Sequence, residues 1–191
     1  NTTLYAVYKY TDGTNTGATK VKASNIVDGG KYYITATNNS TAYMLKAGAF
    51  DVKGSDKNTT TFVAEEATED MAWTFVKATN GWSILSGNYK LGTTNDNNGL
   101  SSATNNTDVW TIAAGTGTYS KLTQSTYKRN LALYQGTNWR TYTSSNGVQS
   151  IQLYSAVTYC YTTSPVCGPY VRITSGKELY VTAGNAGGTR S

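Results

Sequence analysis

Two stretches of this chain share one pattern, and a repeated pattern constrains the fold more than any single motif. Residues 70–85 read DMAWTFVKATNGWSIL, and residues 108–122 read DVWTIAAGTGTYSKL. Each stretch has an aspartate, a short strand-like segment with Trp-Thr, a polar turn with glycine, and a second strand-like segment. The chain therefore contains a repeated unit made of short β-strands.

A third copy emerges when the segments that follow each glycine turn are compared. Each copy starts with an aromatic residue, passes through a polar turn to a strand ending in leucine, and finishes with a closing strand. Apolar residues alternate in the closing strands, which places them on one face, toward a shared core. The starting aromatics are Tyr32, Trp82 and Tyr119, the leucines are Leu45, Leu91 and Leu133, and the closing strands cover 72–76, 109–113 and 150–154 with the pairs Trp73/Phe75, Trp110/Ile112 and Ile151/Leu153.

Composition supports an all-β fold. Tyr occupies 16 of the 191 positions and Gly 19, whereas Pro occupies 2. Tyr and Thr suit pleated surfaces, while Gly and Asn suit turns. Three copies that cannot each bury an apolar face predict a β-trefoil-like barrel with pseudo-threefold closure. A β-sandwich is the alternative all-β architecture, and short β segments are expected to flank the domain.

The segments Gly-x-Tyr-x-Ile, x-Leu-Gly and Trp-x-Ile resemble the repeat of the ricin-type β-trefoil lectins over about residues 26–156. This resemblance implies a trefoil fold and carbohydrate binding without catalysis. The closing motif departs from the family's Gln-x-Trp, because Asp108 and Val109 stand where the family has glutamine and its spacer. Because of this substitution, the family's standard sugar site is not expected in the second copy.

The two flanks carry shorter resemblances. NTTLYAVY, at the start, resembles the last strand of a Listeria–Bacteroides repeat, and TYCYTTSPVC resembles connectors of large exported Bacteroidetes proteins. Common strand sequences are the alternative explanation. The resemblances imply an extracellular or cell-surface protein of several modules, divided here into an N-terminal strand (1–25), a trefoil-like domain (26–157) and a connector leading to a further β module (158–191).

Two cysteines lie close together in the connector, at Cys160 and Cys167. The Ser-Pro turn between them can bring the sulfurs within bridging range, which predicts a local disulfide in an exported protein. The spacing differs from Cys-x-x-Cys, and the chain has no histidine to complete a mixed zinc site. We expect no metal and no cofactor.

Several classes of function are disfavoured by composition. The absence of histidine excludes Ser-His-Asp and Cys-His catalysis within this chain, so we expect no enzyme activity. The net charge is +5, but Lys and Arg are scattered singly, unlike the clustered footprint of nucleic-acid-binding proteins. No stretch has the length and apolar character of a membrane span. The acidic run at Glu65, Glu66, Glu69 and Asp70 is expected to be a solvated loop, with a weak cation site or catalytic carboxylates as alternatives.

Polar loops of the third and second copies hold the candidate ligand-binding residues. Sugar sites combine an aromatic face with polar groups that bind hydroxyls. Trp139 follows a polar turn, so it is expected to be either a ligand platform or a locally packed plug of the barrel. The Asn-rich loop 92–99 offers hydroxyl-binding groups, or forms a turn because Asn and Asp tolerate left-handed geometry. The predicted ligand-binding residues are Trp139, Arg140, Asn138, Tyr134, Tyr142, Asn95 and Asp96.

The sequence therefore predicts a non-catalytic carbohydrate-binding module whose partners are a glycan or polysaccharide and the adjacent modules of its parent protein. One alternative is a structural or adhesive spacer without glycan binding. Another is an accessory domain of a secreted hydrolase whose catalytic domain lies outside this chain.

Overall fold

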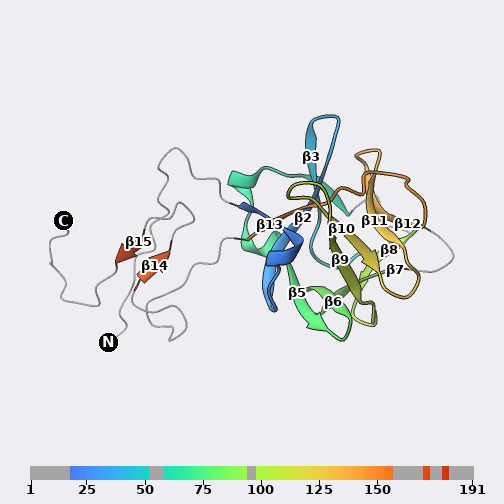
Figure 1. Cartoon of the computed structure of the whole chain (residues 1–191), viewed down its shortest axis with the longest axis horizontal. Helices are drawn as coiled ribbons and strands as arrows, with labels where there is room; N and C mark the ends of the chain where they lie inside the picture. Colours follow the sequence, from blue (N-terminus) through green and yellow to red (C-terminus); the bar gives the residue numbers. More distant parts are fainter. Residues whose placement is uncertain (1–17, 52–57, 94–97, 157–169, 173–177, 181–191) are drawn as a thin grey trace.

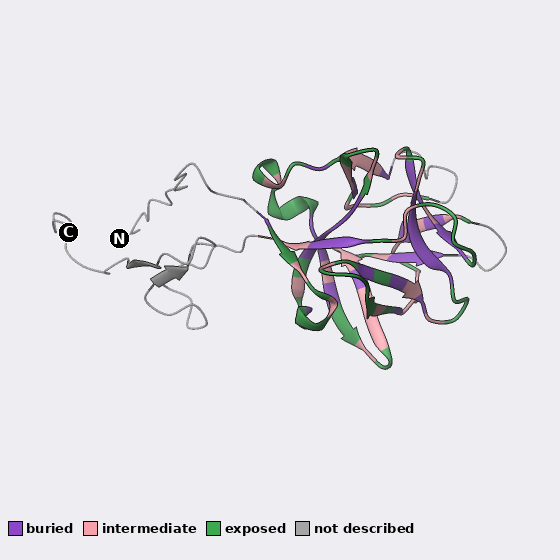
Figure 2. Ribbon diagram, turned by 45° about the horizontal axis from the view of Figure 1, so that its top comes forward, coloured by how far each residue is buried: buried purple, intermediate pink, exposed green. Residues whose placement is uncertain are grey.

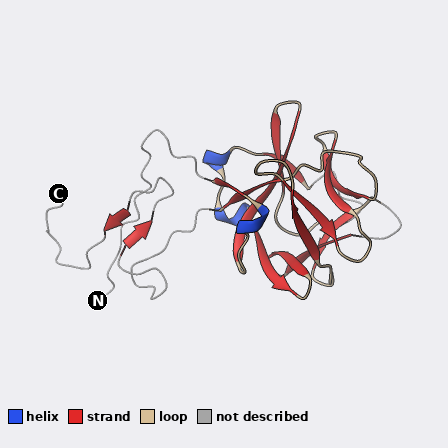
Figure 3. Ribbon diagram, in the orientation of Figure 1, coloured by secondary structure: helices blue, strands red, loops and turns tan. Residues whose placement is uncertain are grey.

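The structure is a computed structural model that describes residues 18–51, 58–93, 98–156, 170–172 and 178–180. These residues form an all-β protein in which the only helical elements are single turns of 3-10 helix (Figure 3). The turns are η1 (Ala23–Asn25), η3 (Ala64–Glu66) and η4 (Glu69–Met71). Within the described ranges, no helix has the length and hydropathy needed to cross a membrane.

Twelve strands fall into three consecutive groups of four, which we call units 1, 2 and 3 (Figure 1). Unit 1 contains β2 (Gly30–Asn38), β3 (Thr41–Leu45), β4 (Thr59–Thr61) and β5 (Trp73–Ala78). Unit 2 contains β6 (Gly81–Ser86), β7 (Tyr89–Thr93), β8 (Leu100–Ala103) and β9 (Trp110–Ala114). Unit 3 contains β10 (Ser120–Gln124), β11 (Asn130–Tyr134), β12 (Asn138–Tyr142) and β13 (Gln152–Ser155).

The same antiparallel pairings recur inside every unit. The second and third strands form a pair in each, as β3·β4, β7·β8 and β11·β12. The first and fourth strands also meet, as β2·β5, β6·β9 and, through the bridge between Ser120 and Ile151, at β10 and the start of β13. The three copies deduced from the sequence therefore correspond to three units with equivalent pairing.

Pairings between units return to the starting strand. β5 pairs with β6, β9 pairs with β10, and β13 pairs with β2. Together with the first-to-fourth contacts inside the units, these pairings connect β2, β5, β6, β9, β10 and β13 in a closed order. A thirteenth strand, β1 (Thr19–Val21), pairs with the outer edge of β13.

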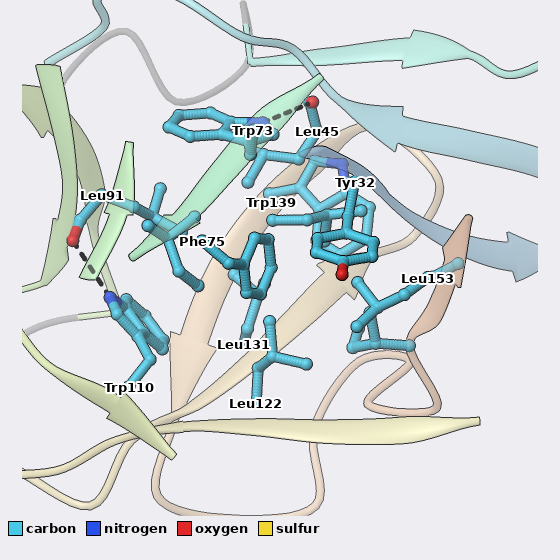
Figure 4. Close-up of a cluster of buried hydrophobic side chains, with 14 of the residues drawn as sticks. Tyr32, Leu45, Trp73, Phe75, Leu91, Trp110, Leu122, Leu131, Trp139 and Leu153 are labelled. Carbon is cyan, nitrogen blue, oxygen red and sulfur yellow. Dashed lines mark hydrogen bonds between the residues drawn. The ribbon is translucent and has the colours of Figure 1, made fainter. Parts of the chain in front are cut away.

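One hydrophobic cluster receives residues from all three units, as the alternation in the closing strands predicts. Trp73, Trp110 and Ile151 are all fully buried in it. The indole Nε1 of Trp73 donates to the Leu45 carbonyl at 3.1 Å, and that of Trp110 donates to the Leu91 carbonyl at 3.0 Å (Figure 4). The closing strands and the leucines of the repeat thus contact one another directly. Figure 2 shows the buried residues along the strands and the exposed residues mainly in their connections.

A smaller cluster lies apart from the main core. It packs Tyr33 and Met44 of unit 1 against Phe62, and Phe62 also stacks near Tyr154 with a ring distance of 4.9 Å. The long connection from β4 to β5 is held there because the Tyr33 hydroxyl donates to the Thr68 carbonyl at 3.0 Å. Unit 1 is longer than the other two units because both this connection (62–72) and the one from β3 to β4 (46–58) exceed their counterparts in length.

Several sequence predictions concern residues outside the described part. The disulfide between Cys160 and Cys167 and the loop residues Asn95 and Asp96 belong to this group. Beyond residue 156 the structure describes a two-stranded pair, β14 (Tyr170–Arg172) with β15 (Glu178–Tyr180). The domain boundaries remain predictions.

Candidate functional site

The β11–β12 hairpin carries most of the residues predicted to bind a ligand. A tight turn connects its strands, because the Thr137 N–H donates to the Tyr134 carbonyl at 2.9 Å. Both central residues have positive φ, 51° at Gln135 and 70° at Gly136, which is the geometry that suits the twist of a β-hairpin. The turn fixes the register in which Tyr134 lies opposite Asn138.

This register corrects the prediction for Trp139. The sequence analysis placed Trp139 in a polar loop, but it is the second residue of β12 and is 0% exposed. Its side chain lies in the main core, near Trp73 and Tyr32 (Figure 4). A tightly buried ring cannot stack on a ligand, so Trp139 is a packing residue, which was the alternative expectation.

Burial of Trp139 places its neighbours on the opposite face. Successive residues of a strand point to opposite sides, so Asn138, Arg140 and Tyr142 share the outer face of β12. Tyr134 lies on the same face of β11, where it pairs with Asn138. These residues, Tyr134, Asn138, Arg140 and Tyr142, form a group that we call the Arg140 cluster.

Arg140 is the centre of this cluster. Its guanidinium lies over the Tyr134 ring, 4.7 Å from the centroid, in a cation–π contact. Its Nε donates to Asn138 Oδ1 at 2.9 Å, which fixes the orientation of the guanidinium. The Tyr134 and Tyr142 rings are 6.3 Å apart, with an interplanar angle of 41°. The structure therefore brings together four of the residues predicted from the sequence.

Ala132 is a residue of this site that sequence reasoning missed. It lies opposite Arg140 in the hairpin register, on the outer face. A methyl group at this position leaves room for the long arginine side chain to lie across the hairpin toward Tyr134. Alternation in the segment NLALY was the available signal, because it sets Ala132 between two inward leucines.

The four residues of the Arg140 cluster differ in solvent exposure. Tyr134 and Arg140 are partly exposed, whereas Asn138 and Tyr142 are 6% and 4% exposed. Burial raises the pKa of the Tyr142 phenol, while the nearby positive charge of Arg140 acts in the opposite direction. Tyr142 is therefore protonated at neutral pH. Tyr134 and Arg140 are therefore the members of the cluster that solvent reaches, and Asn138 and Tyr142 lie beneath the surface.

Arg140 has no acidic partner in the described part of the chain. The ion pair recorded there joins Lys31 to Glu69, which lies on the long connection of unit 1. The planar fork of donors on an arginine matches the two oxygens of a carboxylate or a phosphate. The Arg140 cluster therefore presents a positive charge that is neutralised by none of the described residues.

The inner face of β12 meets unit 2 through a polar network. Thr141 is fully buried, and its hydroxyl lies 2.7 Å from the Thr93 hydroxyl. Arg129 donates from Nη2 to Asn98 Oδ1 at 2.6 Å and from Nε to the Thr141 hydroxyl at 3.2 Å. Asn98 is the first described residue after the predicted loop that contains Asn95 and Asp96. The end of that loop is therefore fixed against the hairpin that carries the Arg140 cluster.

The acidic run lies on the connection from β4 to β5. Glu65 and Glu66 lie in η3, and Glu69 and Asp70 lie in η4, all exposed on the long connection of unit 1. In the described residues, no group of three or more acidic, cysteine or histidine side chains is arranged to hold a metal ion. Glu69 instead pairs with Lys31 on β2.

Comparison with known proteins gives a distant structural likeness. No family model matches the chain. No curated protein matches it in sequence. The fold is similar to a solved structure described as "SeviL bound to asialo-GM1 saccharide", with 16% sequence identity and a TM-score of 0.47. The match covers 68% of this chain and 98% of that chain.

Proposed function

We propose that this chain is a non-catalytic carbohydrate-binding module that binds saccharide at the Arg140 cluster. The observation that carries the proposal is the arrangement of Arg140, stacked on Tyr134 and oriented by Asn138. Carbohydrate sites need an apolar ring beside fixed polar donors, because a sugar presents C–H groups and hydroxyls together. Tyr134 supplies the ring and Arg140 supplies the donors.

The fold belongs to the proposal as well. We propose a β-trefoil in which β2, β5, β6, β9, β10 and β13 form the barrel and the three inner hairpins close one end. The equivalent pairings inside the three units support this assignment. So does the closed order of pairings between the units. In such a fold each unit presents its own surface, and among the described residues only unit 3 combines an arginine with tyrosines in this way.

The wider setting is also proposed. The module belongs to an exported protein of several modules and acts outside the cell or at its surface, where the glycan and the neighbouring modules are its partners. The resemblances of the two flanks support this setting. A spacer role would predict a folded protein that retains no glycan.

A glycan array tests the binding proposal. The wild-type chain is compared with Tyr134→Ala and Arg140→Ala, and Tyr89→Ala serves as the matched control because Tyr89 is a surface tyrosine of unit 2, 38% exposed. The proposal predicts that wild type and Tyr89→Ala bind the same glycans and that both hairpin variants lose them. Thermal unfolding establishes that the variants are folded. Absence of any glycan bound by the folded wild-type chain would contradict the proposal.

A further inference from the structure

The Arg140 cluster offers a ligand more hydrogen-bond donors than acceptors. Arg140 carries donors only, and its guanidinium cannot lose its proton in a protein. The amide oxygen of Asn138 already accepts from Arg140 Nε at 2.9 Å. Apart from the phenol oxygens of Tyr134 and Tyr142, the described cluster has no further side-chain acceptor. A ligand therefore meets mainly N–H donors at Arg140.

The geometry of Arg140 also decides which of its donors are available. The guanidinium carbon lies over the Tyr134 ring, 4.7 Å from its centroid, and the Nε–H is donated to Asn138. Arg140 also hydrogen-bonds the Tyr142 phenol, and the guanidinium N–H groups left over by these two contacts are the donors that a ligand can use. Two such N–H groups match the two oxygens of a carboxylate or a sulfate in a forked, charge-assisted arrangement.

A neutral sugar would leave the positive charge of Arg140 without a counter-charge. Each sugar hydroxyl is both donor and acceptor, and sites for neutral sugars therefore need acceptors as well as donors. The Arg140 cluster offers a charge with no carboxylate to balance it in the described residues. The net charge of +5 adds a general attraction for anions.

We propose that the Arg140 cluster binds an acidic saccharide through an oxyanion, either a carboxylate or a sulfate ester, held in the plane of the Arg140 guanidinium. This inference rests on the proposed function and specifies the chemical class of its ligand. Tyr134 stacks on the guanidinium and on the sugar ring beside the acidic group. Asn138 is a positioning residue that orients Arg140.

The test uses saccharides in matched pairs. The wild-type chain is screened on an array that contains carboxylated and sulfated saccharides next to their methyl-esterified or unsulfated counterparts. Pairs with a positive member are then measured by titration calorimetry with wild type, Arg140→Gln, Arg140→Lys and Lys121→Gln. Lys121 is an exposed residue of β10 outside the Arg140 cluster, so Lys121→Gln removes the same charge without touching the cluster's own side chains.

We expect the acidic member of a pair to bind at least about tenfold more tightly than its neutral partner, as charge-assisted hydrogen bonds require. Arg140→Gln removes that preference, Arg140→Lys restores part of it, and Lys121→Gln keeps it. Preference for a uronic acid indicates the carboxylate, and preference for a sulfated sugar indicates the sulfate.

Three results would overturn the inference, and they separate it from the proposed function. Equal binding of acidic and neutral partners, lost in Tyr134→Ala, refutes the oxyanion and leaves saccharide binding at the hairpin intact. Equal losses in Arg140→Gln and Lys121→Gln refute the site, because they indicate general charge attraction. No binding to any saccharide refutes both proposals.

Discussion

In units 1 and 2 a tryptophan lies on the fourth strand and donates its indole N–H to a leucine carbonyl of its own unit, whereas in unit 3 the tryptophan lies on the third strand. Trp73 and Trp110 follow the first arrangement. Trp139 follows the second, and its buried Nε1 has no hydrogen-bond partner in the described part of the chain. The carbonyl of Leu133, which corresponds to Leu45 and Leu91, accepts the Val148 N–H at 2.8 Å instead.

This comparison of the three tryptophans separates a feature that all units share, the buried indole, from one that varies, the hydrogen bond of the indole N–H. Each unit supplies one fully buried indole, so the volume is needed in all three. Whether the indole N–H has a hydrogen-bond partner depends on which strand carries the tryptophan. In unit 3 the ring comes from β12, and burial of Trp139 turns Asn138 and Arg140 outward. The position of Trp139 on β12 therefore accounts both for its different place in the core and for the outward position of the candidate site residues.

The third tryptophan is also held differently through its backbone. Asn58, which is 0% exposed and immediately precedes β4 of unit 1, accepts from the Trp139 N–H at 2.8 Å and donates to the Trp139 carbonyl at 3.1 Å. One amide side chain therefore substitutes for a neighbouring strand. Units 1 and 3 are joined at the strand that carries the Arg140 cluster.

Removal of the indoles tests the shared part of this comparison and has the largest expected effect. We expect Trp73→Ala, Trp110→Ala and Trp139→Ala each to lower the free energy of unfolding by about 3–5 kcal/mol, because each leaves a large cavity. Chemical denaturation measures the change. A loss below about 1 kcal/mol in Trp139→Ala would contradict its position in the core.

Removal of the Asn58 side chain tests the junction between units 1 and 3. Asn58→Ala leaves the N–H and the carbonyl of Trp139 unpaired in the interior, so we expect a loss of about 2–4 kcal/mol in the free energy of unfolding. Asn105→Ala, in an exposed turn, is the matched control. Equal stability of the two variants would show that Asn58 does not hold β12.

Replacement of each indole by phenylalanine tests the difference between the units. Trp73→Phe and Trp110→Phe leave a buried leucine carbonyl without its donor, while Trp139→Phe removes a donor that has no partner. We therefore expect the first two variants to lose about 1–3 kcal/mol more than Trp139→Phe. Denaturant titrations of all three give the comparison directly. An equal loss in all three would mean that the indole bonds do not distinguish the units.

The smallest expected effect concerns the two aspartates of the repeated pattern. Asp70 is exposed in η4, whereas Asp108 is partly buried between units 2 and 3, where it accepts from the Thr93 N–H at 3.4 Å. Burial raises the pKa of Asp108, while its hydrogen bonds to Thr93 and Gln124 lower it by less. The folded state therefore favours the protonated carboxyl. The stability that Asp108 contributes is present at low pH and is lost as pH rises through its raised pKa.

We expect Asp108→Asn to remove this decline from the acid-range stability profile, measured by thermal unfolding at a series of pH values. Asp70→Asn, at the exposed aspartate, is the matched variant. A profile of Asp108→Asn identical to that of wild type would show that Asp108 titrates no differently in the folded and unfolded chains.

Sequence reasoning was most successful where alternation is clean. The segments around Trp73, Trp110 and Ile151 alternate without interruption, and all three residues are buried in one core. It left Trp139 open between a ligand platform and a packed plug, because the side of the sheet on which a residue lies after a turn depends on the length of that turn. The polar segment before Trp139 allowed both readings, and the short turn at residues 135–137, between the paired residues Tyr134 and Asn138, places Trp139 in the core.

The candidate site was predicted in part for the same reason. Its members were recognised as polar and aromatic neighbours in sequence, but the grouping on one face follows only from the register of Tyr134 with Asn138. The contributions of Ala132 and Asn58 depend on contacts across strands. Asn58 lies 81 positions from Trp139, and no local pattern connects two residues at that separation.

The central claim is that the outer face of the β11–β12 hairpin binds saccharide, and backbone NMR tests it most directly. A saccharide bound on the array is titrated into isotope-labelled chain, and amide shifts are followed residue by residue. The account predicts that the largest changes occur at Tyr134, Asn138 and Arg140, with little change at the corresponding hairpins of units 1 and 2. Changes centred on β3–β4 or β7–β8, with the β11–β12 hairpin unaffected, would contradict it.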